Sequence, residues 1–385
     1  MTESLKLEVR SENKRNYALD LLRIVVMFMV VCLHILNHGN VLALAAGKTY
    51  YLLMGLRNLC VVAVNLYVLI SSYFLVTQKF RPSKLLRLYT EVLFWGVVGY
   101  VFALISGIAT FSVKTLIFGV IFPFSSGYYW FISAYAILYM LSPILNVIIR
   151  KLTRKQHLAV CLGLLFLFSL WKDVFLYGNV FNLSDGYSFG WFIVLYFVGA
   201  YLRLYAEPKK WKLSWVWYFA VAICLTAIAT VATLLPDAAG AVVNSIFVRM
   251  AQYNSILVVL ETVFLFVTFL KFDIKGNAPQ KIIGLIAPSA LGVYLIHDNR
   301  YFRDYLWHNI VKTQNFAENS IVTVLLVLGW AALVFLACLA LSFVRKLIFS
   351  LWEKRKFWRD GLGKFDKFVV GTLYKAADRI TEEKK

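Results

Sequence analysis

The sequence predicts an all-α membrane protein: a polytopic bundle of about ten transmembrane helices whose N- and C-termini are cytoplasmic. Of its 385 residues, 61% are hydrophobic and 16% are charged, whereas an ordinary soluble domain has roughly 25% charged residues. A soluble chain of this size could not bury so many apolar side chains in one core. Aromatic residues make up 17%, with 22 Tyr and 11 Trp, which suits the belts that these side chains form at membrane interfaces.

Hydropathy along the chain predicts ten apolar segments long enough to cross the hydrocarbon core of a bilayer as helices. The ninth contains Pro288 and two glycines, so we expect it to be kinked or broken. In chain order, the ten segments cover residues 18–38, 52–76, 88–110, 128–149, 157–177, 187–206, 214–235, 246–270, 281–298 and 318–344.

The positions of Lys and Arg predict the orientation. A cytoplasmic N-terminus places the connections near 78–87, 150–156, 203–213 and 271–281 inside, together with both chain ends. This side then holds 31 of the 40 basic residues and the opposite side holds eight, as the positive-inside rule requires. The net charge of +20 lies between apolar segments rather than on one basic face, so no nucleic-acid partner is expected.

The predicted spans divide the chain into three parts. Residues 1–17 are a cytoplasmic N-terminal segment, residues 18–344 are the membrane domain, and residues 345–385 are a tail rich in Lys, Arg and aromatic residues. We expect the tail to form a basic amphipathic helix on the anionic inner leaflet. Residues 1–47 also resemble a cleavable signal peptide, but an Arg and a His within the apolar stretch favour a retained first span.

The cysteines point to neither a disulfide framework nor a zinc site. All five fall inside apolar segments and lack the pairing or spacing of either. We interpret them as small buried side chains and expect no metal site. They are Cys32, Cys60, Cys161, Cys224 and Cys338.

The first span carries three ionisable residues, Asp20, Arg23 and His34. Such a residue costs roughly 2.5–3.5 kcal/mol near the centre of a span, so it is a functional candidate. Arg23 and His34 are separated by almost three helical turns and project from one face, about 16 Å apart along the axis. An arginine can hold an anionic group, and a histidine can move a proton at neutral pH. Alternatively, Arg23 reaches the headgroups and pairs with Asp20, and His34 is a core histidine bonded to another helix.

A second basic feature precedes the third span. Arg81, Lys84 and Arg87 recur every three residues and would form one cationic ridge on a helix, which we call the basic ridge. It would face the cytoplasmic opening. One interpretation is positive-inside anchoring; the other is a phosphate-binding site for a nucleotide-like cofactor such as coenzyme A.

Four further residues in or near the spans are weaker candidates for substrate binding. Trp130 and Tyr135 could stack on a sugar or on pantetheine, or they could belong to the aromatic belt. Glu261 could join a polar network that lines a cavity. His297, near the outer face, could bind an acceptor or relay a proton, or it could be solvated at the interface.

Several motifs resemble those of the acyltransferase-3 family of bacterial integral-membrane O-acyltransferases. The Asp20–His34 stretch, in which ten residues separate the Arg from the His, is similar to the family's first-span signature. The resemblance covers most of the membrane portion, and the order of the motifs along one chain is more specific than any one of them. The other similar segments are Val64–Leu75, Tyr129–Tyr135, Leu141–Asn146, Gly190–Tyr201 and Gly292–His297.

The resemblance implies O-acyl transfer, usually of acetyl, from cytoplasmic acyl-CoA to a hydroxyl of a cell-surface or lipid-linked glycan. Acyl-CoA would be a donor substrate rather than a permanently bound cofactor, and lipids of a bacterial cell membrane would surround the protein. His34 matches the family's essential histidine, Arg23 its partner arginine, and the basic ridge its basic motif. That motif normally has two arginines three residues apart, whereas each such pair here contains a Lys. Ser72 also replaces the usual Gly.

Two mechanisms and one other functional class stay open at this point. His34 could act as a general base, typically worth about 10²–10⁴ in rate, or it could carry the acyl group covalently. The main alternative function is a transporter or flippase of a glycan or lipid-linked intermediate, with Arg23 and His34 coupling substrate or protons. The second half of the sequence shows no repeat of the first, which argues against the common transporter plans. A glycan polymerase would have longer outer loops.

Overall fold

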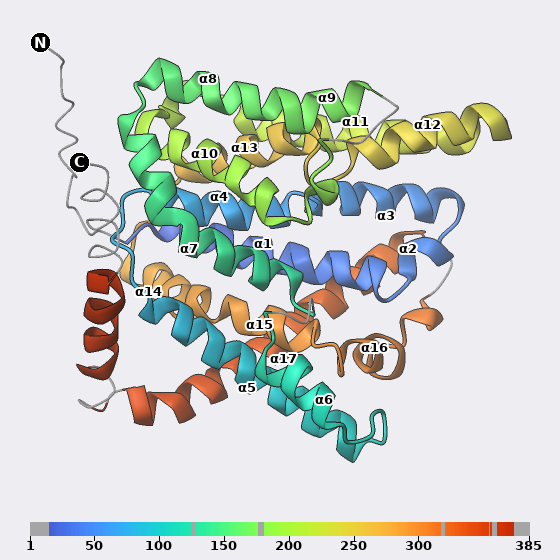
Figure 1. The fold of residues 1–385 in the computed structure, drawn as a ribbon. Coiled ribbons are helices and arrows are strands. Elements are labelled where there is room, and N and C mark those ends of the chain that lie inside the picture. The colour runs from blue at the N-terminus through green and yellow to red at the C-terminus, as the bar shows by residue number, and fades with distance from the viewer. Residues whose placement is uncertain are drawn as a thin grey trace, which may run out of the picture.

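The computed structural model confirms the all-α class, with helices and no strands in the residues that it describes. These are residues 15–124, 128–175, 181–316, 320–353, 355 and 360–372. The long helices lie side by side and run roughly in one direction across the molecule (Figure 1).

Eight helices or helix pairs are long and apolar enough to cross a membrane, and two shorter apolar helices accompany them. Each of them overlaps one of the ten predicted segments. The eight are α1 (Tyr17–Asn37), α3 with α4 (Gly47–Leu75), α5 (Ser83–Ile105), α7 (Trp130–Lys151), α8 with α9 (Arg154–Val174), α11 (Ser214–Leu234), α14 with α15 (Asn277–His297) and the Ile321–Leu351 part of α17 (Ser320–Glu353); the two shorter ones are α10 (Phe189–Tyr205) and α13 (Ile256–Leu270).

The first span lies in the middle of the bundle (Figure 1). Helix α1 packs against α3 (Gly47–Cys60), α4 (Ala63–Leu75), α15 (Ala290–His297) and α17. Asn16 begins the helix, because its side-chain oxygen accepts a hydrogen bond of 3.0 Å from the Leu19 N–H, the usual role of an N-cap. A central position explains how one helix can carry charged groups, since its neighbours cover them.

The ninth span is broken, as its proline predicts. Helix α14 (Asn277–Ile286) and helix α15 are joined by the short 3₁₀ turn Ala287–Ser289, which contains Pro288. Proline has no N–H and crowds the preceding turn, so the α-helix cannot continue through it. Pro288 and its neighbours line a cavity that Arg23 and His34 also line, which places irregular backbone at the site rather than against lipid.

The predicted start of the eighth span, at residue 246, is wrong. Residue 246 lies inside helix α12 (Asp237–Met250), and α13 begins only at Ile256. The carboxylate of Asp173 accepts hydrogen bonds from the Ser255 hydroxyl, at 2.8 Å, and from the Ile256 N–H, at 2.9 Å. This long-range cap fixes the start of α13 after a polar turn. Hydropathy averaged over the apolar neighbours did not reveal the turn.

The last span continues past its predicted end at residue 344. Helix α17 runs to Glu353, and Arg345 is buried within it, with a guanidinium nitrogen 3.5 Å from a carboxylate oxygen of Glu91 on α5. The positive charge of Arg345, which suggested that the span ends at residue 344, is therefore offset by Glu91 on another helix. Among the cysteines, all free thiols, the prediction of burial is confirmed for four and is wrong for Cys224, which is exposed.

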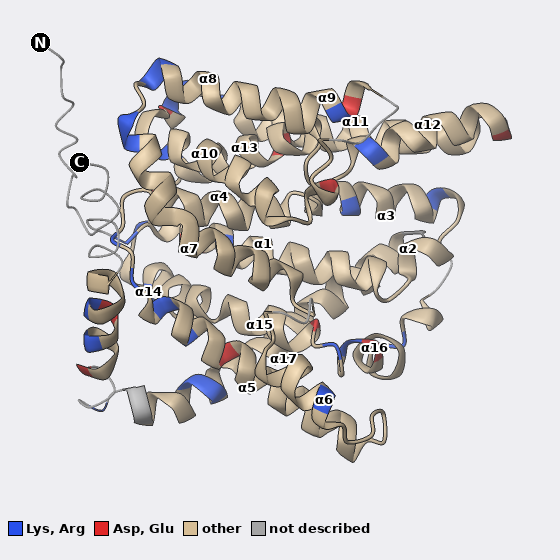
Figure 2. Cartoon of the chain, viewed as in Figure 1, with Lys and Arg blue, Asp and Glu red and all other residues tan. Residues whose placement is uncertain are grey.

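Basic residues gather at one end of the bundle (Figure 2). This end holds the starts of α5 and α8 (Arg154–Leu165) and the tail helix formed by residues 360–372. The opposite end carries the short helices α2 (Val41–Leu44), α6 (Val113–Thr115) and α16 (Arg303–Tyr305). The distribution matches the positive-inside pattern, and a cytoplasmic location of the basic end stays a prediction. We call it the basic end.

The tail helix lies across the basic end, nearly at right angles to the spans (Figure 1). Its Asp366 carboxylate accepts two hydrogen bonds of 2.7 Å from Ser83, one from the N–H and one from the hydroxyl. The carboxylate therefore caps the N-terminus of α5, where negative charge is favoured. Phe368 is 72% exposed, as a helix on a lipid surface would require, although that location stays a prediction.

Replacing Asp366 with Ala is expected to loosen the tail helix, because an N-cap is worth about 0.5–2 kcal/mol. Limited proteolysis of the C-terminally tagged full-length protein should then remove the tail about twofold to thirtyfold faster, since cleavage follows the population of the open form. Lys367→Ala, at an exposed neighbouring position, is the matched control. Equal cleavage of both variants and the wild type would show that the cap does not hold the tail.

Candidate active site

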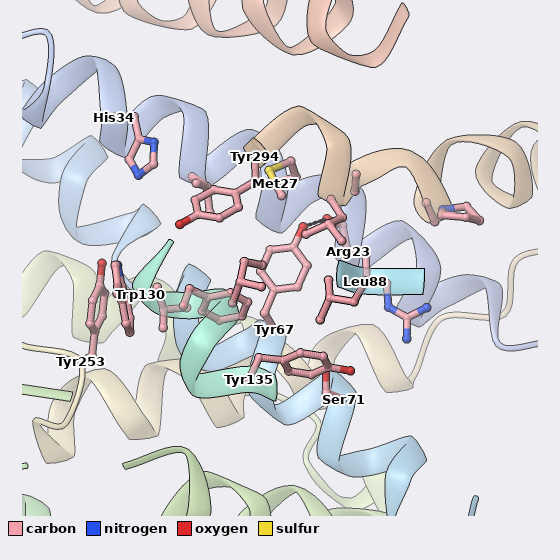
Figure 3. Close-up of a pocket in the computed structure, with 18 residues that line it drawn as sticks. Arg23, Met27, His34, Tyr67, Ser71, Leu88, Trp130, Tyr135, Tyr253 and Tyr294 are labelled. Carbon is pink, nitrogen blue, oxygen red and sulfur yellow. Dashed lines mark hydrogen bonds between the residues drawn. The ribbon is translucent and has the colours of Figure 1, made fainter. Parts of the chain in front are cut away.

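Arg23 and His34 line the same cavity, which has a volume of about 340 Å³. Figure 3 shows them at opposite ends of it, with Met27, Tyr67 and Tyr294 between them. Its walls come from α1, α4, α5, α7 and α15. The helical spacing of the two residues therefore has the predicted consequence: one face of α1 presents both to one space.

Arg23 is held in place by its surroundings. Its Nη1 donates a 2.7 Å hydrogen bond to Asp20, which also accepts one of 2.5 Å from Arg15. The hydroxyl of Tyr67 donates to the Arg23 carbonyl at 2.9 Å. The expected pairing with Asp20 is thus present, yet the guanidinium still reaches the cavity. Because Asp20 is buried and shared by two arginines, a net positive charge remains for an anionic ligand.

His34 meets a second histidine from the ninth span. Its Nδ1 lies 2.9 Å from Nε2 of His297, and Nδ1 of His297 lies 2.6 Å from the carbonyl oxygen of Val293 one turn earlier on α15. His297 is fully buried, and the His38 ring lies 4.8 Å from that of His34. The alternative that His34 bonds to another helix is therefore also observed, and the bond leaves Nε2 of His34 for a ligand.

A buried carboxylate adjoins His34 and His38, the residue that follows α1. An oxygen of Asp298 lies 3.7 Å from Nδ1 of His34, 3.6 Å from Nε2 of His38 and 3.5 Å from a guanidinium nitrogen of Arg303. The ligand atoms of the first three lie within 4.8 Å of one another, a spacing that a metal ion could bridge. The Arg303 charge on the same oxygen opposes a divalent ion there, which favours a cluster of histidines, carboxylate and arginine.

Asn299 fixes the turn that carries Asp298. Its side-chain amide donates to the carbonyl of Trp95, at 2.9 Å, and to the hydroxyl of Tyr129, at 3.0 Å. Gly99 on α5 permits this arrangement, because a Cβ at that position would collide with the Asn299 side chain. The backbone after His297 is therefore tied to α5 and to the start of α7.

Aromatic rings form the other walls of the cavity. Trp130 and Tyr135, both predicted candidates, line it. Trp130 stacks on Tyr253, with ring centroids 6.3 Å apart and an angle of 20°, and its ring lies 4.6 Å from that of Tyr187, which is 49% exposed. In Figure 3, Trp130 and Tyr253 lie toward the His34 end, and Tyr135 lies beside Ser71 toward the Arg23 end.

The other two predicted substrate residues lie outside the cavity lining. His297 lies behind His34 rather than in the cavity. Glu261 is fully buried on α13, and neither of its carboxylate oxygens has a hydrogen-bond partner among the described residues. The structure thus gives Glu261 no contact with Arg23 or His34, and its role in substrate binding stays a prediction.

The basic ridge lies at the start of α5, and all three of its side chains are exposed. Leu88 of the same helix lines the cavity. Lys84 is one turn before Leu88 and shares its side of α5, whereas Arg87 points about 100° away. Arg81 precedes the helix, and its backbone is fixed by hydrogen bonds of 3.2 and 3.0 Å with the Tyr139 hydroxyl. Lys84 is therefore better placed than Arg87 to meet a ligand that leaves the cavity.

Two residues of the site, His38 and Tyr253, were not among the sequence candidates. His38 follows His34 by four positions, so the helical period alone would have placed both on one face. Tyr253 had no local signal, because it precedes α13 and reaches Trp130 only through the fold.

Comparison with known proteins identifies the family. The family model described as the acyltransferase domain, acyltransferase-3, matches residues 16–344. No curated protein and no solved structure matches the chain. The matched region includes all ten apolar helices, although α17 continues beyond it, and the whole of the cavity. The chain therefore belongs to the acyltransferase-3 family and is a multi-pass membrane acyltransferase.

Proposed function

We propose that this acyltransferase moves an acetyl group from cytoplasmic acetyl-CoA to a hydroxyl of a cell-surface or lipid-linked glycan, in a bacterial cell membrane. The observation that carries the proposal is the single cavity that joins Arg23 to His34. Arg23 lies toward the basic end of the bundle and His34 toward the other, about 16 Å apart along α1. A donor and an acceptor that approach from opposite ends would therefore meet at His34.

The Arg23 end suits the CoA moiety. Arg23 and Lys84 would bind its phosphates, for which charge-assisted hydrogen bonds are the strongest available contacts. The pantetheine arm would then follow the cavity past Tyr67 and Tyr135. The thioester would then lie near His34, with Trp130 and Tyr253 left on the acceptor side.

The transfer itself needs one base. Nε2 of His34 takes the proton of the acceptor hydroxyl, whose oxygen attacks the thioester carbonyl carbon. The new C–O bond forms, the C–S bond breaks, and the proton passes from Nε2 to the departing sulfur. The products are an ester and free CoA, and no proton is gained or lost overall.

To test this proposal, the purified full-length protein is incubated with radiolabelled acetyl-CoA and with native membrane lipid and glycan fractions. We expect label in an ester that hydroxylamine releases. Lack of any CoA binding would contradict the proposal and would favour the transporter alternative, in which Arg23 and His34 couple substrate or protons.

Lys84 and Arg87, the two basic residues at the start of α5, are expected to contribute unequally to acetyl-CoA binding. Lys84→Gln is expected to raise KM for acetyl-CoA about fivefold to tenfold, because it removes one charge-assisted contact in partly exposed surroundings. Arg87→Gln, the matched control, should change KM less than twofold, since its side chain points away from the Leu88 side of the helix. The reverse order of effects would show that the CoA phosphates lie along the other side of α5.

A further inference from the structure

A chain of two hydrogen bonds runs from the backbone of α15 to His34. It begins at the Val293 carbonyl, passes through both nitrogens of His297, with distances of 2.6 and 2.9 Å, and ends at Nδ1 of His34. Among the described residues, Nε2 of His34 has no hydrogen-bond partner, and His34 lines the cavity. The hydrogen-bond chain therefore ends on one ring nitrogen of His34, Nδ1, and leaves the other, Nε2, available for chemistry.

The bond between His297 and the Val293 carbonyl determines which atom is the donor in both hydrogen bonds. A carbonyl oxygen can only accept, so Nδ1 of His297 carries a hydrogen. A neutral imidazole has one N–H, which leaves Nε2 of His297 as a lone pair. That lone pair must accept, so the hydrogen between the two rings belongs to Nδ1 of His34. Nε2 of neutral His34 is then a bare lone pair.

This tautomer of His34 requires a neutral His297, and the surroundings of His297 favour that form. The side chain is fully buried, and an unpaired buried charge is costly. The negative charge of the adjacent Asp298 carboxylate is shared, because one of its oxygens lies within 3.7 Å of His34, His38 and Arg303. A proton on His297 would therefore have no counter-ion of its own and would place a positive charge beside His34.

We infer that His297 is a positioning residue, which holds His34 in the Nδ1–H tautomer and so directs its basic Nε2 into the cavity. The inference rests on the proposed role of His34 as the base. When Nε2 accepts the hydroxyl proton, Nδ1–H keeps its acceptor on His297, and the Asp298 oxygen 3.7 Å away offsets the new charge. The same proton then leaves for the CoA sulfur, which restores the neutral tautomer.

Nitrogen-15 NMR of the full-length protein, labelled at histidine, tests the tautomer without any need for activity. We expect the His34 signals, assigned by their loss in His34→Ala, to show a protonated Nδ1 and an unprotonated Nε2. In His297→Phe, which keeps bulk but removes both hydrogen bonds, we expect the Nδ1–H form to be lost. His157→Phe is the matched control: His157 is another fully buried histidine, bonded to the Phe197 carbonyl at 3.0 Å and outside the cavity lining.

Activity provides the second readout. His297→Phe should lower kcat about 10–100-fold, as is seen when the partner that orients a metal-ligating histidine is removed, with KM for acetyl-CoA unchanged. His297→Gln should rescue most of kcat and the Nδ1–H tautomer, because its amide can donate to Val293 and accept from His34.

Each outcome is decisive for the inference. An Nε2–H signal for His34 in the wild type would overturn it, and so would a His297→Phe variant that keeps both the tautomer and kcat. If His297→Phe does not fold, the wild-type spectrum and His297→Gln still decide. An Nδ1–H signal in a wild type that transfers no acetyl group would support the tautomer assignment and overturn the proposed function alone.

Discussion

Replacing His34 with Ala is expected to reduce acetyl transfer by about 10²–10⁴-fold, the usual contribution of a positioned general base. Binding of acetyl-CoA should be nearly unchanged, because the proposed phosphate contacts, Arg23 and Lys84, lie toward the basic end and away from His34. The measurement is kcat with radiolabelled acetyl-CoA, beside equilibrium binding of the same donor to the same preparation.

His157→Ala is the control for this variant, since it also removes a buried histidine from a membrane helix but lies outside the cavity lining. We expect it to keep kcat within a few-fold. A His34→Ala protein that is folded, binds CoA and still transfers acetyl at the wild-type rate would remove His34 from the mechanism.

Replacing Arg23 with Gln should weaken acetyl-CoA binding about tenfold or more, because hydrogen bonds to charged groups contribute about 1.5–3 kcal/mol each. Asp20 keeps its hydrogen bond to Arg15 in this variant, so the protein should still fold. The measurement is the Kd of acetyl-CoA by titration calorimetry of the full-length protein. We expect kcat at saturating donor to fall much less than KM rises.

Arg203→Gln is the matched control, because Arg203 is an exposed arginine at the basic end that contacts Tyr73 and does not line the cavity. It should leave the Kd within about twofold. Equal losses in the two variants would mean that general positive charge at this end attracts CoA, rather than a site at Arg23.

Hydropathy and helical period predicted the ten apolar helices and the common face of Arg23 and His34. Both features depend on residues that are near in sequence, so local patterns are enough. The break before Ile256 was missed because its cap, Asp173, comes from more than 80 residues earlier. The extension of α17 was missed for the same reason, since Glu91 offsets the buried charge of Arg345.

The surroundings of His34 could not be predicted from local pattern either. His297 lies 263 positions further along the chain, and the sequence suggested acceptor binding or proton relay for it rather than a bond to His34. Trp130 was a candidate, but its stacking partner Tyr253 was not. Only the packing of α1, α7 and α15 brings these side chains together. The helix face that carries His34 was therefore predictable, whereas the hydrogen-bond partner that determines its tautomer was not.

The central claim is that donor and acceptor reach His34 from opposite sides of the membrane, and sealed native vesicles of known orientation test it most directly. Radiolabelled acetyl-CoA, which does not cross a bilayer, is added outside. We predict hydroxylamine-labile label in inside-out vesicles, none in intact right-side-out vesicles, and none in inside-out vesicles that carry His34→Ala. Equal labelling in both orientations, or labelling that is independent of His34, would contradict the account.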